Sequence, residues 1–251
     1  MIFAAGLGSR LKPLTDTIPK ALVPINGKPL LEHVIIKLKN AGFDEIIVNI
    51  HHFADQIIEF LQQKNNFGIR IEISDESDML LETGGGIKKA ASFFDDGKPF
   101  LVHNVDILSN VDLPDMYQQA LKTNSIATLL VSRRDTFRYL LFDDNGNLQG
   151  WINEKTGETK SPYNDFNPDL FRKFAFGGIH VISPAIFDLM NEKWSGKFSI
   201  MDFYLSVCDK AIVKAYAPEN LLLIDVGKLE CLNQNFNKIL GFTGLENLDN
   251  H

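Results

Sequence analysis

Apolar and polar positions along the first half of the chain alternate between a helical period and a strand pattern. After Pro29, apolar residues recur at helical spacing until Gly42, which is typical of an amphipathic helix. The elements predicted in this half are, in order, a helix over 29–38, a strand over 45–50, a helix over 53–64, a strand over 69–73, a helix over 86–94, a strand over 99–103 and a helix over 113–122. This alternation predicts right-handed βαβ crossovers, and therefore an α/β, Rossmann-like fold with a mostly parallel sheet and helices on both faces.

The second half of the chain has a less regular pattern. Its predicted elements are strands over 126–132, 139–142, 148–152 and 176–183, a helix over 200–209, a strand over 221–224 and a helix over 228–240. Residues 155–174 are polar and aromatic and contain two prolines. A loop of this length is more often a lid or a mobile segment than a plain connection, so we expect 155–174 to be one.

Length, composition and charge favour one domain with a large core. The chain has 251 residues, of which 45% are hydrophobic. Its formal net charge of −7 argues against nucleic acid or an anionic membrane as a partner, because both require a net basic face. No apolar run approaches the roughly 18 residues of a membrane span, and Cys208 and Cys231 lack metal-ligand spacing. We therefore expect a cytoplasmic protein, with both cysteines reduced.

The opening segment differs from the acidic whole, because residues 1–28 carry four cationic side chains and one acidic one. Within it, Gly6-Leu7-Gly8-Ser9-Arg10 follows a short apolar run and precedes the first long helix. Glycines at such a junction let backbone N–H groups approach a phosphate. The dinucleotide fingerprint fails, since it needs a third glycine where Leu11 stands. The Walker loop fails as well, since Lys12 follows Leu11 and not a glycine.

A longer pattern does fit: A-A-G-x-G-S-R-L-x-P-L-T over 4–15, followed by P-K-A-L-V-P over 19–24. It resembles the signature of the sugar-1-phosphate nucleotidyltransferases. Four shorter motifs resemble the same family in the same order, namely Asn104-Val105-Asp106, Glu154-Lys155, Phe176-Gly177-Gly178-Ile179 and Asp225-Val226-Gly227. The resemblance implies the nucleotide-diphospho-sugar transferase fold, with a smaller sugar-binding part in the second half of the chain.

The resemblance also implies a reaction. A sugar 1-phosphate attacks the α-phosphorus of a nucleoside triphosphate (NTP), an NDP-sugar forms and pyrophosphate leaves. In this interpretation Arg10 grips the β- and γ-phosphates and Lys20 bridges the α-phosphate and the sugar phosphate. Asp106 and Asp225 hold Mg²⁺, which takes carboxylate and phosphate oxygens together. Arg10, Lys20 and Asp106 are thus the implied catalytic residues.

The remaining implied site residues fall into two groups. The nucleotide-binding group is Ala5, Gly6, Gly8, Ser9, Arg10, Lys20, Glu82, Thr83 and Gly84, and the sugar-phosphate group is Asn104, Glu154, Lys155, Phe176 and Gly178. We accordingly expect one nucleotidyltransferase domain over 1–251. Its mainly nucleotide-binding half is 1–123, its mainly sugar-phosphate-binding half is 124–227, and a C-terminal helix and tail fill 228–251.

The segment Leu81-Glu82-Thr83-Gly84-Gly85-Gly86-Ile87 bears on the choice of base. Guanylyltransferases acting on mannose 1-phosphate tend to have Leu-Gly-Thr-Ala-Gly there, with glycine where this chain has Glu82. The segment more closely resembles uridylyltransferases that use N-acetylmuramate 1-phosphate in cell-wall recycling. UTP is therefore the expected triphosphate, and GTP with mannose 1-phosphate is the alternative. Two positions depart from the family pattern: Val105 replaces a frequent glycine, and Lys155 lacks the usual following proline.

Two other functions stay open at this point. The same core could transfer a nucleotide to phosphocholine or another phosphorylated alcohol. The chain could also be a regulatory relative that only binds nucleotide, although such relatives typically lose the metal aspartates or the lysine, and Lys20, Asp106 and Asp225 are all present. The protein is expected to be a monomer or a small homo-oligomer.

Overall fold

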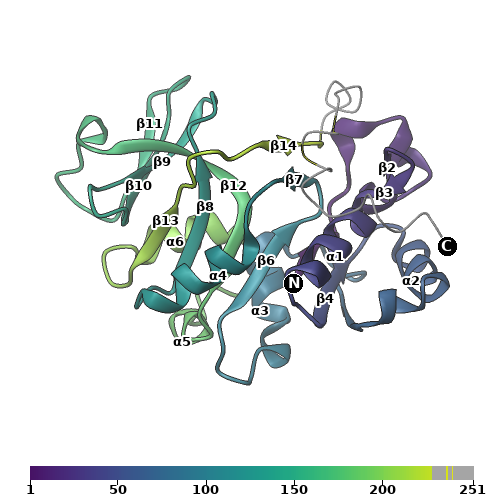
Figure 1. The fold of residues 1–251 in the computed structure, drawn as a ribbon. Helices are drawn as coiled ribbons and strands as arrows, with labels where there is room; N and C mark the ends of the chain where they lie inside the picture. Colours follow the sequence, from purple (N-terminus) through teal and green to yellow (C-terminus); the bar gives the residue numbers. More distant parts are fainter. Residues whose placement is uncertain (228–235, 237–238, 240–251) are drawn as a thin grey trace. The chain divides into compact units, whose positions relative to one another are not determined.

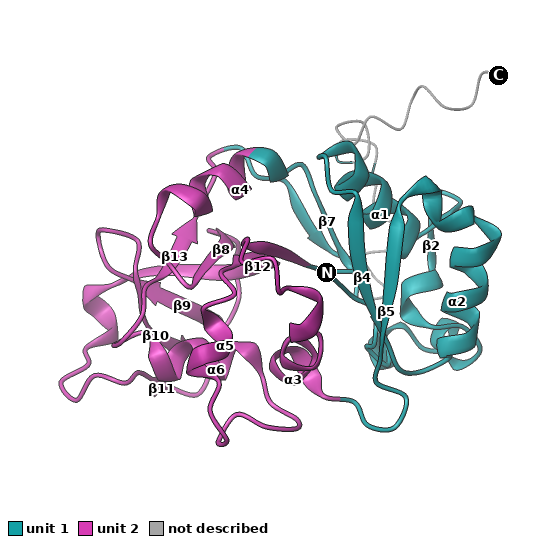
Figure 2. Cartoon of the chain, turned by 90° about the horizontal axis from the view of Figure 1, so that it is seen from below, with its two compact units in different colours: residues 1–80, 103–114, 220–251 teal, residues 81–102, 115–219 magenta. Residues whose placement is uncertain are grey.

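The structure, a computed structural model, describes residues 1–227, Phe236 and Ile239 (Figure 1). The chain forms two compact units that interleave along the sequence (Figure 2). Unit 1 comprises residues 1–80, 103–114 and 220–251, and unit 2 comprises 81–102 and 115–219. These bounds cut across the expected ranges 1–123 and 124–227. Residues 81–102 belong to unit 2, and residues 103–114 then return the chain to unit 1. The assignment of those ranges to nucleotide and sugar phosphate stays a prediction.

Unit 1 is built on parallel strands. The strands of its sheet and the helices between them are β1 (Ile2–Phe3), α1 (Leu30–Asn40), β4 (Glu45–Ile50), α2 (Ala54–Gln63), β5 (Arg70–Asp75) and the end of β6 (Phe100–Asn104). β1 pairs in parallel with β4 on one side and with the end of β6 on the other, and β4 pairs in parallel with β5. The apolar positions of β4 and of one side of α1 are buried, so the periodicity that predicts these elements also forms the core.

Short elements of unit 1 carry the segment between β1 and α1. They are the 3₁₀ turns η1 (Ser9–Leu11), η2 (Leu14–Asp16) and η3 (Lys20–Leu22) and the strands β2 (Pro24–Ile25) and β3 (Lys28–Pro29). β2 and β3 form a hairpin whose turn residues, Asn26 and Gly27, both have positive φ, of 47° and 77°. That geometry is a type I′ turn, which an Asn-Gly pair favours. Elsewhere in unit 1 are η4 (Asn65–Gly68), β7 (Ile107–Ser109) and β14 (Leu223–Asp225).

Unit 2 contains most of the antiparallel pairing. Its elements are α3 (Glu82–Lys89), η5 (Ala91–Phe93), the start of β6, most of α4 (Leu113–Lys122), β8 (Ala127–Ser132), β9 (Arg138–Phe142), β10 (Leu148–Asn153), β11 (Glu158–Lys160), η6 (Pro168–Leu170), β12 (Arg172–Ile182), α5 (Ile186–Leu189), α6 (Ile200–Val207) and β13 (Val213–Tyr216). β12 pairs with β8 and β9, and β10 with β9 and β11, all antiparallel, whereas β13 is parallel to β8. The predicted α/β class is confirmed, with mixed strand pairing.

Several predicted elements need correction. The helix expected at 86–94 begins at Glu82, because its glycines are packed inside the helix and do not precede it. Residues 155–174 do not form one long loop, since β11 pairs with β10 and β12 already begins at Arg172. Cys208 is buried, as expected of a core thiol, and burial raises its pKa to about 12. Cys231 and the helix expected at 228–240 lie outside the described residues, apart from Phe236 and Ile239.

Candidate active site

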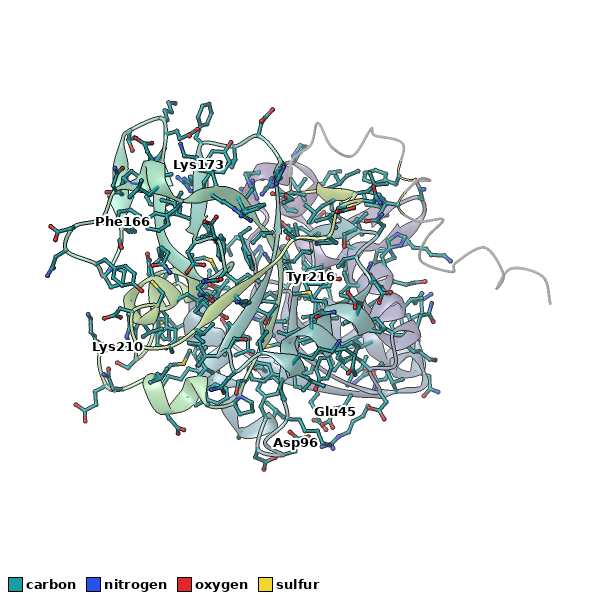
Figure 3. All side chains as sticks on the ribbon, turned by 60° about the vertical axis from the view of Figure 1, so that its left-hand side comes forward. Glu45, Asp96, Phe166, Lys173, Lys210 and Tyr216 are labelled. Atoms are coloured by element: carbon teal, nitrogen blue, oxygen red, sulfur yellow. The ribbon has the colours of Figure 1, made fainter. Side chains whose placement is uncertain are left out.

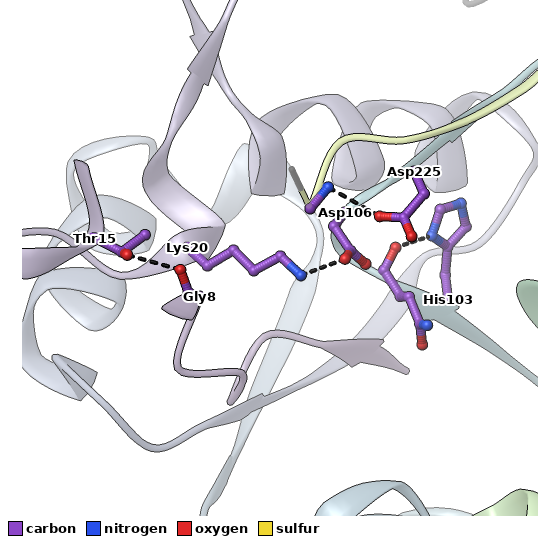
Figure 4. Close-up of polar contacts among 8 residues, drawn as sticks. Gly8, Thr15, Lys20, His103, Asp106 and Asp225 are labelled. Atoms are coloured by element: carbon purple, nitrogen blue, oxygen red, sulfur yellow. Dashed lines mark hydrogen bonds and ion pairs between the residues drawn. The ribbon is translucent and has the colours of Figure 1, made fainter. Parts of the chain in front are cut away.

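Gly8 packs the glycine segment, residues 6–10, against the lysine segment, residues 19–24. It has a φ of 65°, in the left-handed region that favours glycine. A Cβ there would stand 2.8 Å from Cγ2 of Thr15 and 3.0 Å from Cβ of Lys20. The buried Thr15 also donates its hydroxyl to the Gly8 carbonyl at 2.8 Å (Figure 4). The two halves of the long motif are therefore packed directly against each other.

Lys20 is held on a short, proline-bounded turn. Pro19 is extended, with φ −66° and ψ 148°, and Lys20 then begins η3. The carbonyl of Lys20 accepts a hydrogen bond from Val23 N. The side chain forms an ion pair with Asp106 (Figure 4). Only 13% of the Lys20 side chain and 12% of the Asp106 side chain are exposed to solvent. Lys20 and Asp106, predicted from separate motifs, are thus in direct contact.

Asp106 and Asp225 meet through a small antiparallel ladder. Asp106 lies in the turn between β6 and β7, and Asp225 is the last residue of β14. β14 runs antiparallel to β7 with Asp225 opposite Ile107, and Val226 N donates to the Asp106 carbonyl at 2.9 Å. β14 pairs with β7 in a separate two-stranded sheet and not with the parallel strands of unit 1.

Gly227 marks the position around which charged groups converge. A Cβ on Gly227 would stand 2.8 Å from Nη2 of Arg10, 2.8 Å from Oδ1 of Asp225 and 2.9 Å from Oδ2 of Asp106. The two carboxylate oxygens are therefore at most about 6 Å apart. The backbone N–H of Gly227 also donates to Asp225 Oδ1 at 2.9 Å. Arg10, Asp106 and Asp225 thus surround a space that only glycine leaves open.

Asp106 and Asp225 are the side chains here that could hold a hard divalent cation. Two carboxylates supply part of an oxygen shell, and phosphate oxygens and water complete such shells for Mg²⁺. Within the part of the chain that the structure describes, no cluster of three or more His, Cys, Asp or Glu side chains could hold a metal ion. A tight all-protein cage is therefore not formed by these residues, whereas a site shared with a polyphosphate is compatible with them.

Sequence reasoning missed two residues that shape the glycine segment. Thr15 belongs to the long motif but had been given no role. Asn49 is buried on β4, and its Oδ1 accepts from Ala4 N at 2.7 Å and from Ala5 N at 3.3 Å. The predicted nucleotide-binding residue Ala5 therefore already uses its N–H within the protein. The available signal for Asn49 was a polar residue in an otherwise apolar strand end.

The expected base-binding segment lies in unit 2, where it opens α3. Glu82 has a φ of 59°, unusual for a residue with a side chain, and its carboxylate lies 3.5 Å from Nζ of Lys197. Thr83 Oγ1 accepts from Ile200 N at 3.0 Å. A Cβ at Gly84 would overlap the ring of Phe198, whose carbonyl accepts from Gly84 N at 2.9 Å. Packing accounts for Gly84 without a ligand, and its contact with nucleotide stays a prediction.

The expected sugar-phosphate residues are divided between the units. Asn104 belongs to unit 1 with Asp106, and its carbonyl contacts Nδ1 of His103 at 2.8 Å (Figure 4). The others belong to unit 2. There Glu154 accepts from Nζ of Lys173, which is labelled in Figure 3, at 3.0 Å, and Lys155 is exposed. Their role in binding stays a prediction.

Gly178 is explained by the course of β12. The pairing of β12 with β8 shifts register between Phe176 and His180, as in a β-bulge, and Gly178 inside that shift has a φ of 73°. The ring of Phe176 packs edge-on against His180, with centroids 5.5 Å apart. Gly177 and Gly178 therefore bend the strand locally, at the motif that supplies two of the predicted sugar-phosphate residues.

Comparison with known proteins identifies the family. Residues 1–241 match the Nucleotidyl transferase family. The chain is 34% identical over 192 residues to the N-acetylmuramate alpha-1-phosphate uridylyltransferase of Neisseria meningitidis serogroup B, covering 74% of this chain and 82% of that protein. It is 33% identical over 138 residues to a probable mannose-1-phosphate guanylyltransferase 1 of Oryza sativa subsp. japonica, covering 54% of this chain and 38% of that protein.

Solved structures agree on the fold. A putative glucose-1-phosphate thymidylyltransferase from Bacillus anthracis superposes with a TM-score of 0.76 over 99% of this chain and 96% of that one, at 18% identity. The chain belongs to the Nucleotidyl transferase family, and it is an enzyme of the sugar-1-phosphate nucleotidyltransferase class. None of the helices that the structure describes is long and apolar enough to cross a membrane.

Proposed function

We propose that the enzyme transfers the uridylyl group of UTP to N-acetylmuramate 1-phosphate with Mg²⁺, giving UDP-N-acetylmuramate and pyrophosphate. The observation that carries the reaction is the convergence of Arg10, Asp106 and Asp225 around Gly227, with Lys20 paired to Asp106. Cations and carboxylates in one place suit a reaction between two polyanions. They suit a simple nucleotide-binding role less well, since binding alone does not require a shared metal position.

The chemistry needs positioning and charge, and no protein nucleophile. A phosphate oxygen of the sugar 1-phosphate forms a bond to the α-phosphorus of UTP, and the bond from that phosphorus to the bridging oxygen breaks. The electron pair leaves with pyrophosphate, and no proton has to be removed because the attacking phosphate is already ionised. The enzyme therefore has to hold two anions in line and stabilise charge on the oxygens around phosphorus.

The residues of unit 1 would divide this work. The planar guanidinium of Arg10 can bind two phosphate oxygens at once, which suits the β- and γ-phosphates. The N–H groups of Gly6 and Gly8 have no hydrogen-bond acceptor within the described part of the chain, so they can donate to phosphate. Lys20 would leave Asp106 for the α-phosphate and the sugar phosphate, which it would hold against their mutual repulsion.

Asp106 and Asp225 would hold Mg²⁺ at the space beside Gly227. When bound there, the ion would neutralise charge on phosphate oxygens. A bound cation would also provide a second partner for Asp106, which would free Lys20 to contact substrate. The site residues thus have one pairing without substrate and another with it.

The choice of UTP and N-acetylmuramate 1-phosphate rests on similarity to the Neisseria protein and on Glu82. The uridylyltransferase relative is 34% identical over 74% of this chain, whereas the mannose-1-phosphate guanyltransferases of Yarrowia lipolytica and Xenopus laevis align over a similar share at 26–28% identity. Where guanylyltransferases tend to have glycine, this chain keeps a glutamate in a left-handed conformation that glycine would adopt without strain. The presence of Glu82 at a position whose backbone conformation favours glycine supports a specific role for its side chain at the base. The alternative is GTP with mannose 1-phosphate.

The proposed product belongs to nucleotide-sugar biosynthesis for cell-wall recycling in the cytoplasm. The test is release of pyrophosphate by the purified protein with each of four nucleoside triphosphates crossed against N-acetylmuramate, mannose and glucose 1-phosphates, with phosphocholine as a fourth acceptor. The proposal predicts the highest rate for UTP with N-acetylmuramate 1-phosphate. A higher rate for GTP with mannose 1-phosphate would favour the alternative, and turnover of phosphocholine alone would exclude both sugars.

A further inference from the structure

The ends of three parallel strands meet at one buried side chain, Asn49. It stands on β4 directly opposite Phe3 of β1, and β4 lies between β1 and β5. Its Oδ1 accepts from Ala4 N at 2.7 Å and Ala5 N at 3.3 Å, the first two residues after β1. Its Nδ2 donates to Oε1 of Glu76, the first residue after β5, at 2.8 Å. Asn49 therefore fixes the paths of the chain as it leaves both neighbouring strands.

The hydrogen-bond partners of Asn49 determine which way its amide faces. The Ala4 and Ala5 N–H groups only donate, so they require the amide oxygen as their acceptor. The amide nitrogen then faces the other way and donates to Oε1 of Glu76. Glu76 is completely buried and only 2% of Asn49 is exposed, so water cannot easily replace either contact. The pair thus holds one orientation.

The hydrogen bonds to Asn49 come from the two residues directly before the glycine segment. Ala4 and Ala5 donate to Asn49, whereas the next glycines, Gly6 and Gly8, have N–H groups without an acceptor in the described part of the chain. Because the amides of Ala4 and Ala5 are fixed, the residues that follow them have fewer accessible backbone conformations. The amides proposed to bind phosphate are therefore oriented before the ligand arrives, which lowers the entropic penalty of binding.

We infer that Asn49, hydrogen-bonded to Glu76, is a positioning residue that presets the phosphate-binding conformation of the glycine segment. This inference rests on the function proposed for that segment. A purely structural pair would stabilise the fold and leave substrate affinities unchanged. A positioning pair would act on the triphosphate and not on the sugar phosphate, because its hydrogen bonds lead into the glycine segment.

The pair can be exchanged between its two positions, which gives a rescue experiment. Asn49→Asp sets two carboxylates against each other, whereas Asn49→Asp combined with Glu76→Gln restores an acceptor for Ala4 and Ala5 and a donor on the other residue. We expect Asn49→Asp to raise KM for the triphosphate roughly tenfold or more, the size expected for one lost charge-assisted hydrogen bond. KM for the sugar 1-phosphate should change less than about twofold, and the double variant should return to within about threefold of wild type.

Glu32→Gln is the matched control. Glu32 is also a buried carboxylate of unit 1, paired with Nζ of Lys64 at 3.2 Å, and it has no contact with the glycine segment among the described residues. It should lower the melting temperature without changing KM for the triphosphate. All variants are assayed well below their melting temperatures. If Asn49→Asp does not fold, Asn49→Ala, which removes the acceptor for Ala4 and Ala5, is measured in its place. A tenfold rise in its KM for the triphosphate supports the inference, and an unchanged KM overturns it.

Arg10→Ala, measured in parallel by calorimetric titration with UTP, separates failure of the inference from failure of the proposed function. If Arg10→Ala loses triphosphate affinity while Asn49→Asp keeps it within about twofold, only the role of Asn49 is overturned. If Arg10→Ala also keeps its affinity, the glycine segment is not the phosphate site, and both proposals fall. A loss of melting temperature in Asn49→Asp without any change in KM also overturns the inference, since it marks a structural pair.

Discussion

Lys20 and Asp106 form an ion pair in which both side chains are nearly nine-tenths buried. Each residue is therefore the main electrostatic partner of the other in the absence of substrate, and each is proposed to change partner when substrates bind. Stability and catalysis depend on the same contact, but in different ways. Variants of the pair can separate the two contributions.

Lys20→Ala should lower both stability and turnover. It leaves the Asp106 carboxylate beside Asp225 without its cation, which should reduce the free energy of unfolding by roughly 1–3 kcal/mol. Adding Asp106→Asn should restore much of that stability, because the unpaired charge is removed, but turnover should stay at least about a hundredfold below wild type. Urea unfolding and steady-state kinetics on the single and double variants measure both effects. Recovery of kcat in the double variant would exclude a catalytic role for the pair.

Gly227→Ala should abolish metal binding with little change in the fold. The added methyl group would occupy the position that lies within 3 Å of Arg10, Asp106 and Asp225. Because a ligand that binds only the folded state raises stability, Mg²⁺ should raise the melting temperature of the wild-type enzyme and not that of Gly227→Ala. Differential scanning calorimetry with and without Mg²⁺ gives the comparison. An equal shift in both proteins would remove this position from the metal site.

Gly8→Ala should disturb the motif far more than Gly6→Ala. Gly8 has positive φ, and a Cβ there would press on Thr15 and Lys20, whereas a Cβ on Gly6 meets nothing within 4 Å. We expect Gly8→Ala to reduce the free energy of unfolding by about 1–3 kcal/mol and Gly6→Ala by less than about 0.5 kcal/mol. Similar melting temperatures for the two variants would contradict the packing of the glycine segment against the lysine segment.

Glu82→Gly should stabilise the protein and weaken its choice of base. Glycine relieves the left-handed backbone at this position, worth roughly 0.5–1 kcal/mol, and the exposed contact with Lys197 contributes little. If Glu82 acts at the base, the ratio of kcat/KM for UTP to that for GTP should fall at the same time. Thermal unfolding and the two kinetic constants test the pair of effects. An unchanged ratio would mean that Glu82 does not select the base.

His180 should make stability depend on pH between about 6.5 and 3. Its buried ring accepts or donates one hydrogen bond with Tyr204 Oη at 2.8 Å, and burial lowers its pKa from 6.5 to about 3. In that pH window the unfolded chain binds a proton that the folded chain does not, so stability falls as pH falls, by about 2 kcal/mol at pH 5. His180→Gln should show a correspondingly shallower loss between pH 7 and pH 5 in urea unfolding. Identical slopes would contradict a neutral, buried His180.

The long elements of unit 1 could be predicted from the sequence because their patterns are local. Helix α1 and strand β4 have strong periodicities of their own, so their bounds could be read from a few consecutive residues. Arg10 and Lys20 were found because the motif around them is long. The family resemblance implied that Asp106 and Asp225 share one site. The β7–β14 ladder that brings them together was not expected, because antiparallel pairing between distant short strands leaves no local pattern.

Asn49 illustrates what local reasoning cannot supply. A polar residue at the end of an apolar strand has many explanations, and only the neighbouring strands show that its amide joins Ala4 and Ala5 to Glu76. The same holds for Gly84, whose close contact with Phe198 depends on a segment far along the chain. Residues that act through tertiary contacts become visible once the fold is known.

Uridylyl transfer to N-acetylmuramate 1-phosphate is tested best by identifying the product of the reaction. The purified enzyme is incubated with equal concentrations of UTP and GTP and of N-acetylmuramate and mannose 1-phosphates in the presence of Mg²⁺, and the nucleotide sugars are identified by mass spectrometry. We expect UDP-N-acetylmuramate as the main product, and none when EDTA replaces Mg²⁺. GDP-mannose as the main product, or undiminished synthesis in EDTA, would contradict it.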